Sequence, residues 1–136
     1  MARRSEQRRA AVFALYQHDV TGRPLSDTLG KNAPLFTRAL AHAAEDYTPD
    51  TDAIISRLAE GWTVERIAPL EKAIMRVALT EMLHPDAIPG DSPIPPEGAI
   101  EEAVETAKTY AGAQAPKFVN GILGAALREM REDAAR

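Results

Sequence analysis

Four arginines stand near the start of the sequence, at a spacing that suits the binding of phosphate groups. Arg3, Arg4, Arg8 and Arg9, against the single acid Glu6, give residues 1–9 a formal charge of +3 in a chain whose net charge is −4. On a helix Arg4 and Arg8 lie one turn apart on the same face, and guanidinium groups match phosphate oxygens well. The pattern fits two interpretations equally: a phosphate-binding helix, or a solvated end whose charge only aids solubility.

Aromatic side chains accompany the basic residues at two places. Arg9 is followed by Phe13 and Tyr16 at helical spacing, and rings in such positions can stack on unpaired bases. Later in the chain Lys117 and Phe118 open a predicted helix, and the free N–H groups of a helix N-terminus can receive a phosphate. The alternative for this second place is a solvated Lys117 and a core position for Phe118.

The sequence shows no pattern typical of catalysis or of a metal site. It has no cysteine, which excludes disulfides, thiolate catalysis and cysteine-ligated metals. The three histidines, His18, His42 and His84, lack metal-ligand spacing, and no serine or threonine lies in a nucleophile-elbow or phosphate-loop context. The glutamates of residues 101–105 are typical of a solvated helix face. We expect no enzyme activity, no metal and no cofactor.

Composition and length favour an ordinary globular protein. The 136 residues are 45% hydrophobic and 26% charged, which is typical of a soluble chain with one core. We therefore expect a single domain over residues 1–136. No cleavage pattern of a signal peptide follows the first apolar stretch, and no segment is long enough in apolar residues to cross a bilayer. These observations predict a cytoplasmic protein without membrane contact.

Apolar residues recur at spacings of three and four along most of the chain, which predicts helices. No alternating run long enough for a paired strand is present, so the predicted fold class is all-α. Five of the ten prolines fall between residues 84 and 98, which predicts a loop there. The expected helices cover residues 5–20, 25–29 and 35–47, a stretch from a cap at Asp50 or Thr51 to Gly61, residues 70–84 and 100–112, and Lys117 to Met130.

The segment 70–84 is apolar around most of its circumference, which is typical of a central helix. Glu81 lies on its apolar side, and a buried carboxylate must be paired or hydrogen-bonded, so we expect an internal partner for it. Trp62 is expected in the core. Gly121 and Gly124 lie inside the last helix, where glycine is unfavourable by about 1 kcal/mol; they suggest close approach of another backbone, the central helix being the obvious one.

Four segments, in this order along the chain, resemble the NusB family of bacterial transcription antitermination factors: RRAAVFALYQ, GWTVERIAPLEKAIMRVALTEML, AIEEAVETAKTYAG and KFVNGILGAAL. The resemblance implies a compact fold of about seven helices and no catalysis. It also implies binding to the single-stranded boxA element of nascent ribosomal RNA leaders, together with the small-subunit ribosomal protein known in this role as NusE. The pair would join an assembly on RNA polymerase that suppresses termination.

On the first helix the resemblance assigns phosphate contact to Arg4 and Arg8, with Arg3 and Arg9 in support. The family has a denser run of basic residues at this place. In this sequence Ser5 and Glu6 interrupt the run. The interruption predicts a weaker affinity for RNA without any change of fold.

The resemblance assigns further contacts elsewhere in the chain. Lys117 and Phe118 match a second RNA-facing region, and Gln114 matches a loop beside the RNA. Because relatives often carry an acid at the position of Gln114, its neutral side chain predicts less repulsion of phosphate. Tyr16 and Glu71 match positions that hold the ribosomal protein; from the sequence alone, Glu71 could equally be a charge that complements the N-terminus of its helix.

Two other functions stay open at this point. A protein-interaction or self-associating scaffold with weakened RNA binding fits the interrupted arginine run, and a homodimer would cover the first helix if it formed as in some relatives. The same helical domain also occurs at the N-terminus of some ribosomal RNA cytosine methyltransferases. That alternative requires the sequence to be part of a longer protein, because no glycine-rich cofactor loop follows before Arg136.

Overall fold

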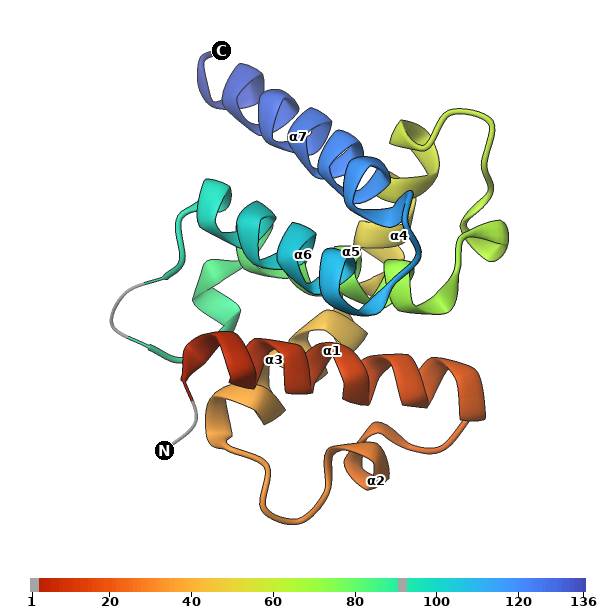
Figure 1. The fold of residues 1–136 in the computed structure, drawn as a ribbon. Helices are drawn as coiled ribbons and strands as arrows, with labels where there is room; N and C mark the ends of the chain where they lie inside the picture. Colours follow the sequence, from red (N-terminus) through yellow and green to blue (C-terminus); the bar gives the residue numbers. More distant parts are fainter. Residues whose placement is uncertain (1–2, 91–92) are drawn as a thin grey trace.

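The computed structural model describes residues 3–90 and 93–136, and within this part of the chain it contains helices and no strand (Figure 1). The all-α prediction is confirmed. The elements, in order, are α1 (Arg4–Thr21), α2 (Leu25–Leu29), α3 (Leu35–Asp46), α4 (Thr48–Leu58), the 3-10 helix η1 (Val64–Arg66), α5 (Pro69–Leu83), the 3-10 helix η2 (Pro85–Ala87), α6 (Pro96–Tyr110) and α7 (Ala115–Ala134).

Helix α5 lies at the centre, as its apolar circumference predicts. Every residue from Ala73 to Met82 is buried, and α1, α3, α4, α6 and α7 all pack against this helix. Pro69 occupies its first turn, where the missing N–H costs nothing. The apolar residues of all seven α-helices join in one continuous core around it.

Two ion pairs show how α1 lies on α5. Arg8 meets Glu81 at one end, and Lys72 Nζ lies 3.7 Å from an Asp19 oxygen at the other. The two helices are therefore antiparallel. Helix α1 ends at Gly22, whose φ of 73° allows its N–H to reach the carbonyl of residue 18, a conformation that favours glycine.

Helix α6 lies beside α1 and runs in the same direction (Figure 1). The Ser5 hydroxyl donates to Glu102 at 2.7 Å near the start of both helices. Eight residues further along each helix, Phe13 meets Tyr110. The end of α6 therefore lies next to the middle of α1, and residues 111–114 connect it to the start of α7.

The predicted cap of the fourth helix is wrong. Helix α4 begins at Thr48, no side chain caps it, and Asp50 and Thr51 lie inside it. The Thr51 hydroxyl donates to the carbonyl of Thr48, a local bond at 3.3 Å. The helix can begin earlier because Pro49 fits its first turn, where no N–H donor is needed. Gly61 lies beyond the helix, which ends at Leu58.

Two further expectations are wrong for reasons of local geometry. A Cβ built at Gly121 would meet nothing within 4 Å, and at Gly124 the nearest group is the Arg128 side chain of the same helix, 3.7 Å away. Neither glycine marks close approach of α5. Trp62 is 53% exposed, because it follows the turn at Gly61 on the outside of the α4–η1 connection.

Before α6, the described part of the proline-rich segment predicted as a loop is irregular except for one short helix. Residues 85–87 of the predicted loop form η2, and the remainder up to Pro95 is irregular where it is described, outside residues 91–92. Helices α6 and α7 both begin a few residues earlier than expected, each with a proline in its first turn.

No helix of the described residues is long and apolar enough to cross a membrane.

Candidate nucleic-acid interface

The predicted phosphate-binding arginines gather around one aromatic ring. The guanidinium carbon of Arg4 lies 4.1 Å from the centre of the Phe36 ring, and that of Arg8 lies 5.3 Å from it. Phe36 is buried on α3, so α1 and α3 meet through this contact. Cation–π attraction of this kind contributes about 0.5–2 kcal/mol. We call the group formed by Arg3, Arg4, Arg8 and Phe36 the arginine end.

Arg8 also forms a buried ion pair. Its Nε donates to both carboxylate oxygens of Glu81, at 2.9 and 3.0 Å, and the two side chains are 13% and 6% exposed. Burial raises the pKa of the Glu81 carboxyl, while the hydrogen bond and charge of Arg8 oppose that rise. The expected internal partner of Glu81 is thus confirmed. That partner is an arginine assigned to phosphate contact, so Arg8 has a structural task as well.

The residues that interrupt the arginine run take different positions. Ser5 is half-buried and joins α1 to α6 through its bond to Glu102. Glu6 is exposed on the first turn. Arg3 and Arg4 are exposed as well, whereas Arg9 is half-buried. The interruption therefore contributes a helix contact at Ser5 and leaves an acid in solvent beside the exposed arginines.

A second group of predicted RNA contacts lies at the start of α7. Gln114 and Lys117 are exposed, and Phe118 is half-buried. Trp62 stands with its ring edge-on to Phe118, the ring centres being 6.4 Å apart. Phe118 thus packs on the core and also borders solvent, so neither alternative taken from the sequence describes it alone. We call the group formed by Trp62, Gln114, Lys117 and Phe118 the aromatic end.

An aromatic pair lies between the two ends. Phe13 of α1 and Tyr110 of α6 meet edge to face, with ring centres 5.0 Å apart and planes at 89°. Tyr110 is 50% exposed. The nine residues from Arg4 to Phe13 span about 14 Å of helix, and residues 111–114 lead from Tyr110 to α7. Tyr110 is not among the residues predicted from the sequence, because its only signal is a tyrosine at the end of an amphipathic helix.

The fold agrees with comparisons to known proteins. The NusB family profile matches residues 5–128. The transcription antitermination protein NusB of Rubrobacter xylanophilus is 39% identical over 134 residues, covering 90% of this chain and 88% of that protein.

The chain belongs to the NusB family. Its curated relatives carry the name of a transcription antitermination protein rather than that of an enzyme. The solved structure of T. maritima NusB has a TM-score of 0.78 and 31% identity, covering 91% of this chain and 89% of that one. A structure of the antitermination factors NusB and NusE in complex with double-stranded RNA has a TM-score of 0.75 at 23% identity, covering 90% and 93%, which is a likeness of fold.

One of the two expected partner contacts of this NusB-family chain, Glu71, lies at the aromatic end. Glu71 stands in the first turn of α5 and makes no hydrogen bond or ion pair to another described residue; burial raises the pKa of its carboxyl. A cavity of about 290 Å³ is bordered by Glu71 together with Trp62, Gln114 and Phe118. Tyr16 is half-buried against the core, on the part of α1 that approaches the start of α5. Residues assigned to RNA and to protein contact thus share one region.

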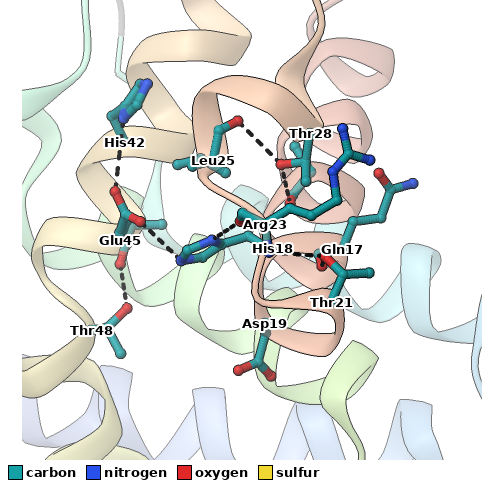
Figure 2. Close-up of polar contacts among 12 residues, drawn as sticks. Gln17, His18, Asp19, Thr21, Arg23, Leu25, Thr28, His42, Glu45 and Thr48 are labelled. Carbon is teal, nitrogen blue, oxygen red and sulfur yellow. Dashed lines mark hydrogen bonds and ion pairs between the residues drawn. The ribbon is translucent and has the colours of Figure 1, made fainter.

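Histidines that are distant in the sequence come together at the far end of α1 (Figure 2). His18 Nε2 lies 3.0 Å from a Glu45 oxygen, its Nδ1 donates to the carbonyl of Arg23 at 2.6 Å, and His42 Nδ1 lies 3.9 Å from the other Glu45 oxygen. Within the described residues no group of three or more metal-binding side chains has the geometry of a metal site. This cluster joins α1 to α3 and lies apart from the arginine end.

Proposed function

We propose that this NusB-family chain is an RNA-binding antitermination adaptor. It binds the single-stranded boxA element of nascent ribosomal RNA leaders together with a NusE-type ribosomal protein, and the pair joins the RNA polymerase assembly that suppresses termination. The observation that carries the proposal is the placement of the arginine end, the Phe13–Tyr110 pair and the aromatic end along adjoining parts of α1, α6 and α7. The structure of NusB and NusE with RNA, a protein of the same fold, supports the choice of partners.

The RNA contacts divide into charges and rings. Arg3 and Arg4 are exposed and offer guanidinium groups to phosphates. Arg8 adds positive charge from a mostly buried position, and Lys117 adds a cation at the aromatic end. Exposed rings such as Tyr110 and Trp62 offer faces to unpaired bases, whose stacking contributes about 1–3 kcal/mol per base. With so few phosphate-directed side chains, the chain alone binds RNA weakly.

The protein partner completes the surface. Glu71 has no internal ion pair among the described residues, so a basic side chain of a ribosomal protein can pair with it. Tyr16 adds apolar area with one polar tip. A partner seated there lies beside Gln114 and Phe118 and brings its own basic residues to the RNA. The whole chain acts as one domain, in the cytoplasm, without catalysis.

A self-associating scaffold is the second candidate, and one observation favours it. Arg8 is held internally by Glu81, so fewer arginines of α1 are available to phosphate than the sequence suggests. A homodimer that covers α1 would compete with RNA. Light scattering with and without RNA separates the two functions, because RNA shifts a competing dimer to monomer.

The decisive experiment is a fluorescence-anisotropy titration of a short boxA-like RNA, with the chain alone and with a NusE-type partner, over a salt series. We expect the partner to tighten binding and Arg4→Ala to weaken it. The salt slope of the variant should be smaller by roughly 0.7 for each lost phosphate contact on a single strand. Arg128→Ala, which removes an exposed arginine of α7, is the matched control. Equal binding of boxA-like and scrambled RNA by the pair would refute the proposal.

A further inference from the structure

A cavity of about 320 Å³ opens beside the arginine end. Arg4, Arg8 and Phe36 form one side of it, and Ile88, Pro89 and Ile94 of the segment between η2 and α6 contribute to the other. Figure 1 shows the part of this segment that directly follows η2, residues 88–90, approaching the N-terminal end of α1. The volume lies at the lower end of the range for small-molecule sites, about 300–1,000 Å³. None of the RNA or partner contacts predicted from the sequence involves Ile88, Pro89 or Ile94.

The two guanidinium groups at this cavity have donors left over. Arg8 uses its Nε on Glu81, and its terminal nitrogens make no hydrogen bond to another described residue. Arg4 donates through Nη1 to the side chain of Gln7 at 3.0 Å, while its Nη2 points toward Gly90, where a Cβ would lie 4.0 Å away. Several N–H groups are therefore available to one anion at the mouth of the cavity.

The arrangement also presents a flat surface. The guanidinium carbon of Arg4 lies over the Phe36 ring, 4.1 Å from its centre, and Arg4 is an exposed residue. The opposite face is thus open, and Phe36 holds it in place. Unpaired RNA bases stack on guanidinium planes as they do on aromatic rings. A phosphate would use only the N–H groups of the arginines and would gain nothing from apolar side chains. The apolar side of the cavity at Ile88 and Ile94 therefore fits a base and not the RNA backbone.

We propose that this cavity holds one unpaired base of the bound RNA, stacked on the outer face of Arg4, with a neighbouring phosphate on the terminal nitrogens of Arg4 and Arg8. The inference rests on the proposed RNA-binding function and adds a base-binding site to it. The charge around the cavity is small, because Glu81 offsets Arg8 and the net charge of Arg4, Arg8 and Glu81 is about +1. This charge favours RNA over an acidic peptide only modestly. The planar stacking surface, which a peptide carboxylate does not need, decides for the base.

The test separates charge from stacking. Arg4→Lys keeps the charge but loses the plane, and Ile88→Trp fills the cavity while every arginine remains. The controls are Arg128→Lys, and Val20→Trp at an exposed position near the other end of α1. Each protein is titrated, in the presence of the NusE-type partner, with a boxA-like RNA and with a series in which one base at a time is replaced by an abasic site.

We expect one abasic position to weaken binding to the parent protein by about 5- to 150-fold, the range that base stacking gives. Arg4→Lys and Ile88→Trp should each lose affinity for the complete RNA and lose sensitivity to that same position, with an unchanged salt slope. The control variants should behave as the parent. Circular dichroism and thermal unfolding check that Ile88→Trp is folded, and the exposed Arg4→Lys gives an independent answer if it is not.

Other outcomes would overturn the inference in distinguishable ways. If Arg4→Ala weakens binding but Arg4→Lys and Ile88→Trp do not, Arg4 contacts phosphate only and the cavity stays empty, while the proposed function stands. If an acidic peptide displaces RNA from the parent but not from Ile88→Trp, the cavity is a peptide site. If the parent does not distinguish boxA-like from scrambled RNA, the proposed function itself fails.

Discussion

Removal of Arg8 should destabilise the fold much more than removal of an exposed arginine. Arg8→Ala leaves the Glu81 carboxylate, 6% exposed, without its only ion-pair partner among the described residues. Breaking a buried pair from one side costs about 3–5 kcal/mol. For a chain of this length 1 kcal/mol shifts Tm by about 3–5 °C, so we expect a fall of about 10–25 °C. Arg4→Ala, at an exposed position, should change Tm by only a few degrees.

Replacing both partners should restore most of this stability. In Arg8→Met/Glu81→Leu no charge is buried, and apolar replacements of buried pairs are often neutral or stabilising. The four proteins of the cycle (parent, Arg8→Met, Glu81→Leu and the double variant) give a coupling energy, which for groups in direct contact is about 0.5–3 kcal/mol. Urea unfolding at pH 7, followed by circular dichroism, measures all four.

The pH dependence provides a second check on the same pair. Burial raises the pKa of the Glu81 carboxyl in the folded state, so the folded chain binds its proton more tightly than the unfolded chain does. The contribution of this group to stability is therefore greatest at low pH and falls as pH rises through the raised pKa. Without Arg8 the pKa rises further. The loss of unfolding free energy caused by Arg8→Ala, relative to the parent protein, should thus be smaller at pH 5 than at pH 7.

Two results would refute this reasoning. A cost below about 1 kcal/mol for Arg8→Ala would have the size of a surface ion pair and would mean that the pair is solvated. A deficit that does not change between pH 5 and pH 7 would mean that the Glu81 carboxylate finds another partner. RNA binding by the folded double variant then shows what Arg8 itself contributes to affinity.

Four other changes test separate parts of the interface. Tyr110→Leu should weaken RNA binding by about 5- to 150-fold without changing the salt slope, as measured by anisotropy; a changed slope would point to lost charge. Glu6→Arg should tighten RNA binding and steepen the slope by roughly 0.7 or more, with Glu132→Arg as the control on α7. Gln114→Asp should weaken RNA binding because it adds like charge beside phosphate. Glu71→Gln should weaken binding of the NusE-type partner in calorimetry. Since burial alone raises the pKa of Glu71, its ionised form opposes folding above that pKa, so the variant should be slightly more stable at pH 7 and lose that advantage near pH 4.

The helices were predictable because their signals are local. Periodic apolar residues predicted the seven α-helices of the described residues and the central position of α5. Pro69 indicated where α5 begins. The burial of Glu81 also followed from its place on an apolar face. Its partner did not, because Arg8 is 73 residues away and any of the sixteen basic residues satisfied the same requirement. Sequence periodicity predicts that a charged side chain is buried, but it does not predict which helix carries the residue of opposite charge.

The error at Trp62 has a physical cause, which is that side-chain type alone does not fix exposure near a turn. Trp62 was expected inside because large rings are usually buried, yet the turn at Gly61 carries it outward. The same effect places Tyr110 at a helix end with half its surface free. His18 and His42 share a carboxylate (Figure 2) only because α1 and α3 are neighbours. Most of the candidate interface rests on such relations between elements.

The distribution of charge explains why this chain should depend on a partner. Its net charge is −4, so the chain as a whole repels RNA, and the arginine end is the place on α1 where an RNA strand can approach. There Arg8 is largely neutralised by Glu81, and Glu6 opposes Arg3 and Arg4. The remaining attraction orients the strand without holding it tightly. A basic protein that pairs with Glu71 removes one negative charge from the aromatic end and adds its own positive charges, so the affinity gained from the partner should decrease steeply with salt.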